Sequence, residues 1–489
     1  MGNKISIIGS GFSSLAASCY LAKEGNEVSI YEKNSTLGGR ARQLIIDGFT
    51  FDMGPSWYWM PDVFERFFAD FNKKPSDYYN LEKLDPAYKV FFEDGKSITI
   101  EDTLEKIYTA FENEEKGSAK KLKKFIDQAQ SNYNIAIKDL VYRPGVSPLE
   151  LVTPATIKKI GQFFSTISRD VRKEFKNEYL IQILEFPVLF LGAKPSDTPS
   201  FYSFMNYADF GLGTWHPKGG MYMVIAGMVE LAKSLGVKMH TNASVEKINC
   251  TEDGRAISIT VNGEIIPSHV VLCGSDYHHS ETLLEPKFRQ YSEKYWDKKT
   301  FAPSSLLFYV GFSKKLKNVE HHNLFFDVDF QAHARDIYDE PKWPEEPLFY
   351  ANFTSKTDSN TAPENCENGF FLIPLAPGIE DTKELREQYF DKIITRFEKL
   401  TNQEVKKYVI FKESFCVNDF ISEYNSYKGN AYGMANTLLQ TAFLRPKLMS
   451  SKVKGLFFTG QLTVPGPGVP PALISGKLVS GLIQKEFIL

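Results

Sequence analysis

The sequence has few cysteines and no pattern among them. Its five cysteines, at positions 19, 250, 273, 366 and 416, are odd in number, scattered, and form no CxxC pair. A disulfide framework or a zinc site needs paired or closely spaced cysteines. The sequence therefore predicts neither, no other metal site is expected, and the cysteine usage fits a reducing compartment.

Long apolar runs and a surplus of one charge are also missing. No run reaches the roughly 18 apolar residues that span a bilayer, so we expect no transmembrane helix. A strand-like segment already begins at Ile5 and leaves no room for a signal peptide. The formal net charge of −3 gives no electrostatic reason to expect a nucleic-acid partner.

The composition is that of a large globular protein rich in aromatic residues. Because the chain has 489 residues, we expect more than one lobe. Aromatic residues make up 14% of the chain and include 39 Phe and 24 Tyr. They are numerous enough to line a large apolar cavity or simply to fill a core.

The first forty residues contain a dinucleotide-binding pattern. Ile5–Ile8 reads as a buried strand, Gly9-Ser-Gly11-Phe-Ser-Ser14 follows at once, and Leu15–Ala22 reads as a helix. Val28–Tyr31 reads as a second strand, and Glu32 stands at its end. The order strand, glycine turn, helix, strand is the context that such a fingerprint requires.

The residues of this pattern have distinct tasks. Gly9 allows a tight turn, and Gly11 lets the backbone approach a diphosphate. The diphosphate would meet N–H groups at Phe12 and Ser13, at the positive end of the helix dipole. Glu32 is placed to accept hydrogen bonds from ribose hydroxyls, which favours NAD or FAD over NADP.

A second glycine turn distinguishes between these dinucleotides. Lys33 leads directly into Gly38-Gly39-Arg40, and together they resemble the extended fingerprint of the FAD-dependent amine oxidases and carotenoid desaturases. By that resemblance Lys33, Gly39 and Arg40 lie along FAD, which is the expected cofactor.

The next segment is rich in tryptophan and tyrosine. Gly54-Pro55-Ser56 resembles the segment that passes beside the isoalloxazine ring in this superfamily. Trp57, Tyr58 and Trp59 follow directly. They would either form a wall against the flavin and substrate or cover an interface between lobes.

Segments farther along resemble the bacterial phytoene desaturases. They are Glu185–Pro187, Lys194–Tyr207 and Gly213–Met221. In that family the last of these precedes a helix, here Val224–Leu235. The helix leads to a strand and turn that hold the adenine side of FAD and end at Val245.

The resemblance extends to the C-terminus. Gly274-Ser275-Asp276 ends a buried strand and, by the resemblance, returns the chain to the FAD-binding lobe. Gly460 and Gly468-Val469-Pro470 belong to a segment that resembles the terminal FAD motif. Two positions depart from the family's pattern. Ser14 stands where Gly or Ala is usual, and Gly274 stands where Ala or Asn is usual.

The resemblance implies an α/β fold of the flavin amine-oxidase kind, with a Rossmann-like FAD-binding lobe, a mixed-sheet substrate lobe and a helical cap. Three segments, 1–75, 216–285 and 426–489, would assemble the FAD-binding lobe. Residues 76–215 would form the helical cap, facing substrate and membrane, and residues 286–425 the sheet and helices of the substrate domain.

The candidate catalytic base is Glu150, at a position where members of the family tend to carry an acid. Arg143 is its candidate orienting partner. The alternative is a solvent-facing helix acid with a neighbouring arginine. We interpret His216, in a Trp-His-Pro turn, as a structural residue.

The resemblance implies an FAD-dependent oxidoreductase that acts on CH–CH groups. The first candidate is a phytoene desaturase, which introduces successive double bonds into a forty-carbon polyene toward lycopene by hydride transfer to flavin. The second is a later-step enzyme such as a hydroxycarotenoid 3,4-desaturase. A flavin amine or porphyrinogen oxidase and a non-catalytic flavoprotein are further alternatives.

The same resemblance implies partners and a location. The expected substrate is a long apolar polyene, phytoene or another carotenoid, and the expected electron acceptor is quinone or oxygen. No nucleic-acid partner is expected. The expected location is the cytoplasm, in peripheral association with the inner face of the cell membrane.

Overall fold

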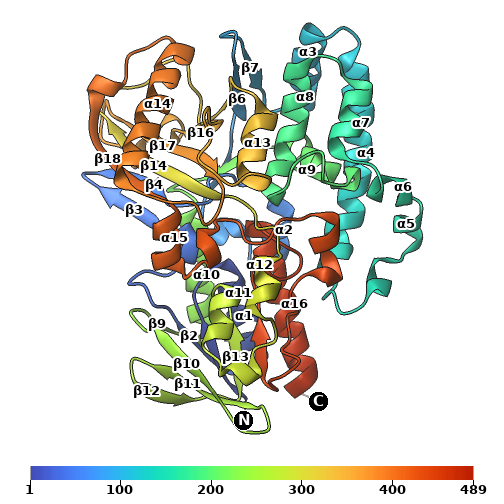
Figure 1. Cartoon of the computed structure of the whole chain (residues 1–489), viewed down its shortest axis with the longest axis vertical. Helices are drawn as coiled ribbons and strands as arrows, with labels where there is room; N and C mark the ends of the chain where they lie inside the picture. Colours follow the sequence, from blue (N-terminus) through green and yellow to red (C-terminus); the bar gives the residue numbers. More distant parts are fainter. Residues whose placement is uncertain (1, 488–489) are drawn as a thin grey trace.

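The protein has two lobes built on sheets, with a group of helices beside the second lobe (Figure 1). The computed structural model describes residues 2–487, apart from the side chains of residues 190, 438 and 487. The outermost residues of the expected segments 1–75 and 426–489 therefore lie outside the described part.

The first lobe is built on a parallel sheet in the order β19-β13-β1-β2-β9. Its strands are β1 (Lys4–Ile8), β2 (Glu27–Tyr31), β9 (Lys238–His240), β13 (Val270–Cys273) and β19 (Leu456–Phe458). Alternate residues of β1 enter different cores: Ile5 and Ile7 pack with the helices, and Ile8 packs on the opposite face. Both faces are thus covered, as a parallel sheet requires.

Helices cover one face of this sheet and a small antiparallel sheet covers the other (Figure 1). The helices are α1 (Phe12–Lys23), α10 (Tyr222–Ser234) and α16 (Val469–Phe487). The antiparallel strands are β10 (Val245–Cys250), β11 (Ala256–Val261) and β12 (Glu264–Pro267). Asn262 and Gly263 join β11 to β12 with φ angles of 49° and 82°, as the Asn-Gly pair predicts for a two-residue hairpin turn.

The second lobe contains a mixed sheet in the order β18-β14-β17-β16-β15-β6-β7. Its strands are β6 (Tyr88–Phe92), β7 (Ser97–Ile100), β14 (Ser304–Phe312), β15 (His322–Phe326), β16 (Phe349–Asn352), β17 (Glu367–Leu375) and β18 (Val409–Phe415). Helix α14 (Lys383–Thr401) packs on it, and its N-cap is Thr382. The remaining helices of this half are α13 (Phe330–Tyr338) and α15 (Val417–Tyr424).

Residues 76–215 were expected to form a helical cap, but the first part of this segment forms strands. Strands β6 and β7 lie in this segment, and β6 pairs in parallel with β15 of the substrate sheet. The cause is the buried run Val90, Phe91 and Phe92, which fills both faces of a strand. Strand β5 (Leu81–Lys83) also lies here and pairs with β8 (Trp215–Pro217).

The rest of that segment is helical. Its helices are α3 (Leu104–Glu114), α4 (Ser118–Lys138), α5 (Pro154–Ile157), α6 (Ile160–Phe163), α7 (Ile167–Glu174), α8 (Glu178–Glu185) and α9 (Phe204–Asn206). The amphipathic stretch 158–175 is divided rather than continuous, because Thr166 starts α7 by accepting a hydrogen bond from the N–H of Arg169. Among residues 2–487, no helix is long and apolar enough to cross a membrane.

Short elements complete the fold. A hairpin of β3 (Gln43–Ile46) and β4 (Phe49–Asp52) turns at Asp47 and Gly48. The remaining helices are α2 (Pro61–Ala69), α11 (Tyr277–Thr282) and α12 (Glu293–Asp297).

Candidate functional site

A large cavity of about 610 Å³ lies between the two lobes. Every residue that the sequence suggested for cofactor binding lines it. They are Gly9, Gly11, Phe12, Ser13, Glu32, Lys33, Gly39, Arg40, Gly54, Pro55, Ser56, Val245, Gly274, Asp276, Gly460, Gly468, Val469 and Pro470. Segments more than 400 residues apart in the sequence therefore meet at one site.

The glycine turn after β1 has the geometry of an anion cradle. Gly9 has a φ of 88°, which a side chain would strain. Gly11 precedes α1 without a side-chain cap, and a Cβ added there would meet no atom within 4 Å. The first N–H groups of α1 thus face open space, where a diphosphate fits.

Glu32 is held in place at the end of β2. Its Oε2 accepts hydrogen bonds from the N–H and the hydroxyl of Ser10, at 3.0 and 2.6 Å, and its Oε1 accepts one from the N–H of Asn34 at 2.9 Å. Carboxylate oxygens accept more than one bond each, so lone pairs remain for ribose hydroxyls. The neighbouring Lys33 donates to Asn425 near the end of α15.

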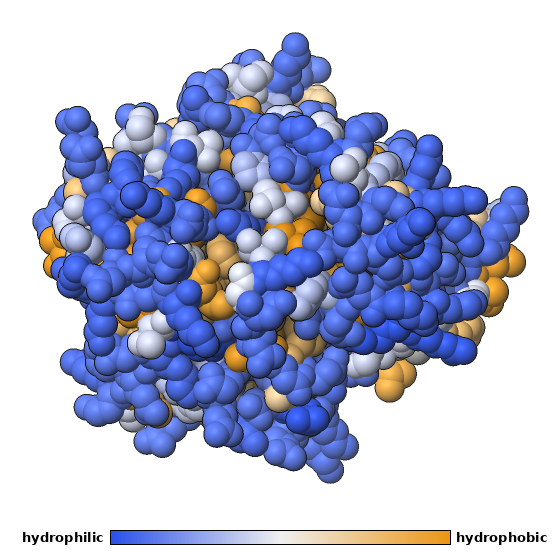
Figure 2. All heavy atoms as spheres, turned by 90° about the horizontal axis from the view of Figure 1, so that it is seen from above, coloured by the Kyte–Doolittle hydropathy of each residue, from blue (hydrophilic) through white to orange (hydrophobic). Residues whose placement is uncertain are grey.

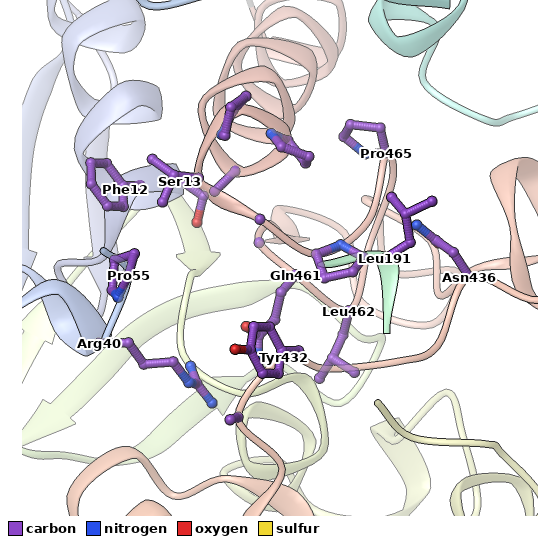
Figure 3. A pocket seen from close by; sticks show the side chains of 18 of the residues that line it. Phe12, Ser13, Arg40, Pro55, Leu191, Tyr432, Asn436, Gln461, Leu462 and Pro465 are labelled. Carbon is purple, nitrogen blue, oxygen red and sulfur yellow. The ribbon is translucent and has the colours of Figure 1, made fainter. Parts of the chain in front are cut away.

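Arg40 brings a positive charge to the cavity (Figure 3). Its Nη2 donates to Ser426 Oγ at 3.1 Å, whereas its buried Nε has no hydrogen-bond partner among the described residues. Burial raises the pKa of Asp276, and the charge of Arg40 opposes that rise. An unpartnered buried donor beside an anion cradle fits an anionic cofactor such as FAD.

The C-terminal segment closes the same side of the cavity. Gly460 and Gly468 have φ angles of 107° and 114°, and α16 begins directly after Gly468. A Cβ added at Gly476 would lie 2.5 Å from the carbonyl oxygen of Ser13, so α16 packs closely on α1. This contact ties the C-terminal segment to the fingerprint helix.

The other end of the cavity is apolar. It is lined by side chains that include Trp57, Phe163, Phe186, Phe201, Phe326 and Leu372. Trp57 and Trp59 line it, as the wall interpretation predicts, but Tyr58 does not. The Tyr58 hydroxyl lies 2.9 Å from that of Tyr79, and its ring stacks on Phe64, so it belongs to the core.

Comparisons with known proteins agree with this geometry. Residues 12–484 match the family of flavin containing amine oxidoreductases. A carotenoid 3,4-desaturase of Haloarcula japonica is 41% identical, with 97% of each chain covered. A zeta-carotene-forming phytoene desaturase of Myxococcus xanthus is 30% identical over 98% of this chain and 93% of the other.

This chain belongs to the flavin containing amine oxidoreductase family. The expected relationship with bacterial carotenoid desaturases is confirmed. FAD is the cofactor, and the protein is an FAD-dependent oxidoreductase.

Solved structures of similar fold confirm the predicted fold class. An oxidoreductase from Methanosarcina mazei has a TM-score of 0.63 at 15% identity, covering 98% of this chain and all of the other. A putrescine oxidase has a TM-score of 0.61 at 14% identity, covering 99% of each chain. At such low identity these likenesses concern the fold alone.

Glu150 and Arg143 both line the cavity, but they are not paired through their charges. The Glu150 carboxylate accepts hydrogen bonds from the N–H groups of Gly145, Val146 and Ser147 at 2.8–3.2 Å. Arg143 forms an ion pair with Asp139 and donates to the main-chain oxygen of Glu150. Three N–H groups donate to the carboxylate, which is the geometry of a loop-stabilising cap, and its oxygens keep lone pairs as those of Glu32 do.

Tyr350 is a polar residue of the cavity that was not predicted from the sequence. It lines the cavity together with the predicted Ser56, and it contacts the buried His322. The adjacent pair His321-His322, shortly before the apolar run Leu324–Phe326, was the available signal. His216, interpreted as structural, lies beside them with a ring-centroid distance of 4.7 Å to His321.

Proposed function

We propose that this protein is an FAD-dependent carotenoid desaturase, which inserts carbon–carbon double bonds into a long apolar polyene. The observation that carries this proposal is the apolar end of the cavity, which continues directly from the cofactor-binding turns. Burial of hydrocarbon contributes about 25 cal/mol per Å², so such a lining can hold a substrate that has few polar groups. FAD, when bound, supplies the hydride acceptor, and the protein positions the polyene and excludes water.

Two substrates are supported by different observations. The motif resemblance favours phytoene, converted stepwise toward lycopene. The relative at 41% identity is a carotenoid 3,4-desaturase, which favours a later carotenoid desaturated at the 3,4-bond. We keep phytoene first and the later carotenoid as the alternative.

Pigment analysis tests the proposal and separates the substrates. The chain is expressed alone in cells that accumulate phytoene and, in parallel, in cells that accumulate neurosporene or a hydroxylated carotene. Red lycopene or a shorter desaturation series in the first cells indicates phytoene. Unchanged phytoene together with a new double bond in the second cells indicates the later step. No new pigment in either, from soluble flavin-loaded protein, would contradict the proposal.

The proposal includes peripheral association with the inner face of the cell membrane. Eight large apolar side chains are 40–78% exposed in two neighbouring segments. They form what we call the apolar rim: Val146, Leu149, Val152, Ile157, Ile160, Phe164, Leu439 and Leu444. Figure 2 shows apolar atoms at the right edge, the side on which α5 and α6 lie in Figure 1.

The apolar rim surrounds lining residues of the cavity. Four residues of the same two segments line the cavity: Gly145, Leu151, Phe163 and Phe443. Lys447 joins the two segments by donating a hydrogen bond to the carbonyl oxygen of Gly145. A polyene dissolved in lipid would enter there without crossing water, which supports a cytoplasmic protein docked on the bilayer. A membrane quinone is then an accessible electron acceptor, with oxygen as the alternative.

A further inference from the structure

A buried polar network reaches the cavity at Ser56. The hydroxyl of Tyr350, on β16, lies 3.0 Å from Ser56 Oγ and 2.6 Å from Nδ1 of His322, on β15. Nδ2 of Asn352 lies 3.1 Å from the same Nδ1. The His322 ring stacks on Trp57, with centroids 4.0 Å apart and planes inclined by 9°. The stacking and the two hydrogen bonds hold the imidazole in one orientation.

These contacts assign the protons. The amide nitrogen of Asn352 can only donate, so Nδ1 of His322 is an acceptor and carries no proton. Tyr350 must then donate its hydroxyl proton to Nδ1. Burial lowers the pKa of His322 well below its usual range, so the ring is neutral, with its proton on Nε2.

We infer that Tyr350 is the proton acceptor of the desaturation and that His322 acts through it; the inference rests on the proposed function. The C–H bond of the substrate carbon breaks, and its electron pair forms the new double bond as the neighbouring carbon gives up its hydride to FAD. The released proton bonds to Oη of Tyr350. The proton already on Oη passes to Nδ1 of His322.

A neutral tyrosine is adequate for this step. A proton on a carbon next to one that has lost a hydride is strongly acidic, so a carboxylate is not needed to remove it. The imidazole of His322, hydrogen-bonded to the Tyr350 hydroxyl, raises the capacity of that hydroxyl oxygen to accept a proton. Ser56 positions the oxygen from the side of the cofactor segment.

The neighbouring groups set the charge around His322. The His321 ring centroid lies 4.5 Å from that of His322, and His216 follows at 4.7 Å from His321. His216 Nε2 lies 3.7 Å from Asp358 Oδ2. The nearby His216 lowers the pKa of Asp358 to about 2, so an ionised carboxylate ends the series. This carboxylate favours a positive charge on the series, whereas burial, together with the charge of His216, opposes one on His321 and His322 and lowers their pKa.

Two of these imidazoles have a nitrogen that no hydrogen bond satisfies. Nε2 of His321 and Nε2 of His322 are buried and have no hydrogen-bond partner among the described residues. Unpartnered buried ring nitrogens are costly in a core that has only a structural role. Their grouping beside the reaction cavity therefore points to a chemical role.

The test compares Tyr350→Phe with Tyr389→Phe in FAD-loaded protein. Tyr350→Phe should lower kcat by 10²–10³-fold, the size of a lost general base, while FAD content and the Kd for the polyene change less than twofold. Tyr389→Phe, which removes a hydroxyl that donates to the main-chain oxygen of Pro344 outside the cavity, should leave kcat within twofold. Tyr350→Phe that keeps kcat within threefold, or that raises only KM, would overturn the inference.

A spectroscopic measurement is independent of turnover. In protein labelled with ¹⁵N in its eight histidines, Tyr350→Phe should shift one unprotonated Nδ1 resonance toward that of a free acceptor. His322→Gln should remove the same resonance. An unchanged spectrum in Tyr350→Phe would contradict the assigned hydrogen bond. If wild-type protein desaturates no carotenoid, the proposed function fails instead, whatever the spectrum shows.

Discussion

The side chain of Ser14 occupies the space that a side chain at Gly274 would need. A Cβ added at Gly274 would lie 1.9 Å from Ser14 Oγ. Ser14 lies in the first turn of α1, and Gly274 directly follows β13, so helix and sheet approach closely here. The two departures from the family's usual residues therefore compensate each other.

This relationship predicts a coupled pair of substitutions. Gly274→Ala should lower the free energy of unfolding by about 1–3 kcal/mol through overpacking and should weaken FAD retention. Ser14→Ala should be nearly neutral, because Ser14 Oγ is buried without a hydrogen-bond partner. Urea unfolding of Ser14→Ala/Gly274→Ala should recover most of the loss. A double variant as unstable as Gly274→Ala would contradict the compensation.

Gly11→Val should remove the flavin without unfolding the protein. A Cβ at this position meets no protein atom within 4 Å, so the valine side chain would clash with the bound diphosphate and not with the protein. Gly481→Ala on α16 is a matched control, since its Cβ also meets no atom within 4 Å. Flavin absorbance and circular dichroism of both purified variants are the measurements. A folded Gly11→Val protein with full flavin would show that the turn does not hold the cofactor.

The FAD-binding half could be predicted because its signals are local. The β1–α1–β2 unit follows from a short apolar run, two glycines and a terminal acid, all within residues 5–32. The cap formed by Glu150 was also readable, since Ser147-Pro-Leu-Glu150 has the capping-box spacing. The role of Glu150 as the catalytic base rests on the resemblance and stays a prediction.

The remaining features depend on contacts that no local pattern encodes. Ser56 and Tyr350 are 294 residues apart, and they meet only because the second sheet brings β16 beside the Gly54-Pro55-Ser56 segment. The pairing of β6 with β15 also joins distant segments, with Asn323 opposite Lys89, so the strands at the start of the expected cap were missed. Long-range pairing of this kind is decided by the assembled core.

Asp209 should make stability depend on pH. The buried side chain of Asp209 accepts a hydrogen bond from the Tyr88 hydroxyl on Oδ2, whereas its Oδ1 has no hydrogen-bond partner among the described residues. Burial raises the pKa of Asp209 to about 8. The folded state therefore keeps a proton that the unfolded state loses near pH 4. Stability should fall as pH rises from about 4 to about 8, by up to about 1.4 kcal/mol per pH unit.

Asp209→Asn removes this titration and serves as the comparison. Urea unfolding of wild-type and variant protein across that pH range should give a difference that grows in favour of the variant as the pH rises. A difference that stays constant with pH would mean that Asp209 is ionised in the folded protein.

The apolar rim should carry membrane binding. Leu149 and Phe164 are 75% and 78% exposed. Leu149→Glu/Phe164→Glu should reduce co-sedimentation with lipid vesicles at least tenfold, because each charge opposes insertion into the interface. Ile265→Glu, on β12 of the FAD-binding lobe and 69% exposed in the wild type, should leave binding unchanged. Equal loss in both proteins would place the contact elsewhere.

The most direct test of carotenoid desaturation is anaerobic mixing of FAD-loaded protein with a carotenoid in liposomes. The flavin absorbance and the carotenoid spectrum are recorded over one turnover. The proposed function predicts that the flavin is reduced and that one new double bond forms per flavin, with phytoene or with a later carotenoid. A flavin that stays oxidised with every carotenoid, but is reduced by an amine, would contradict it.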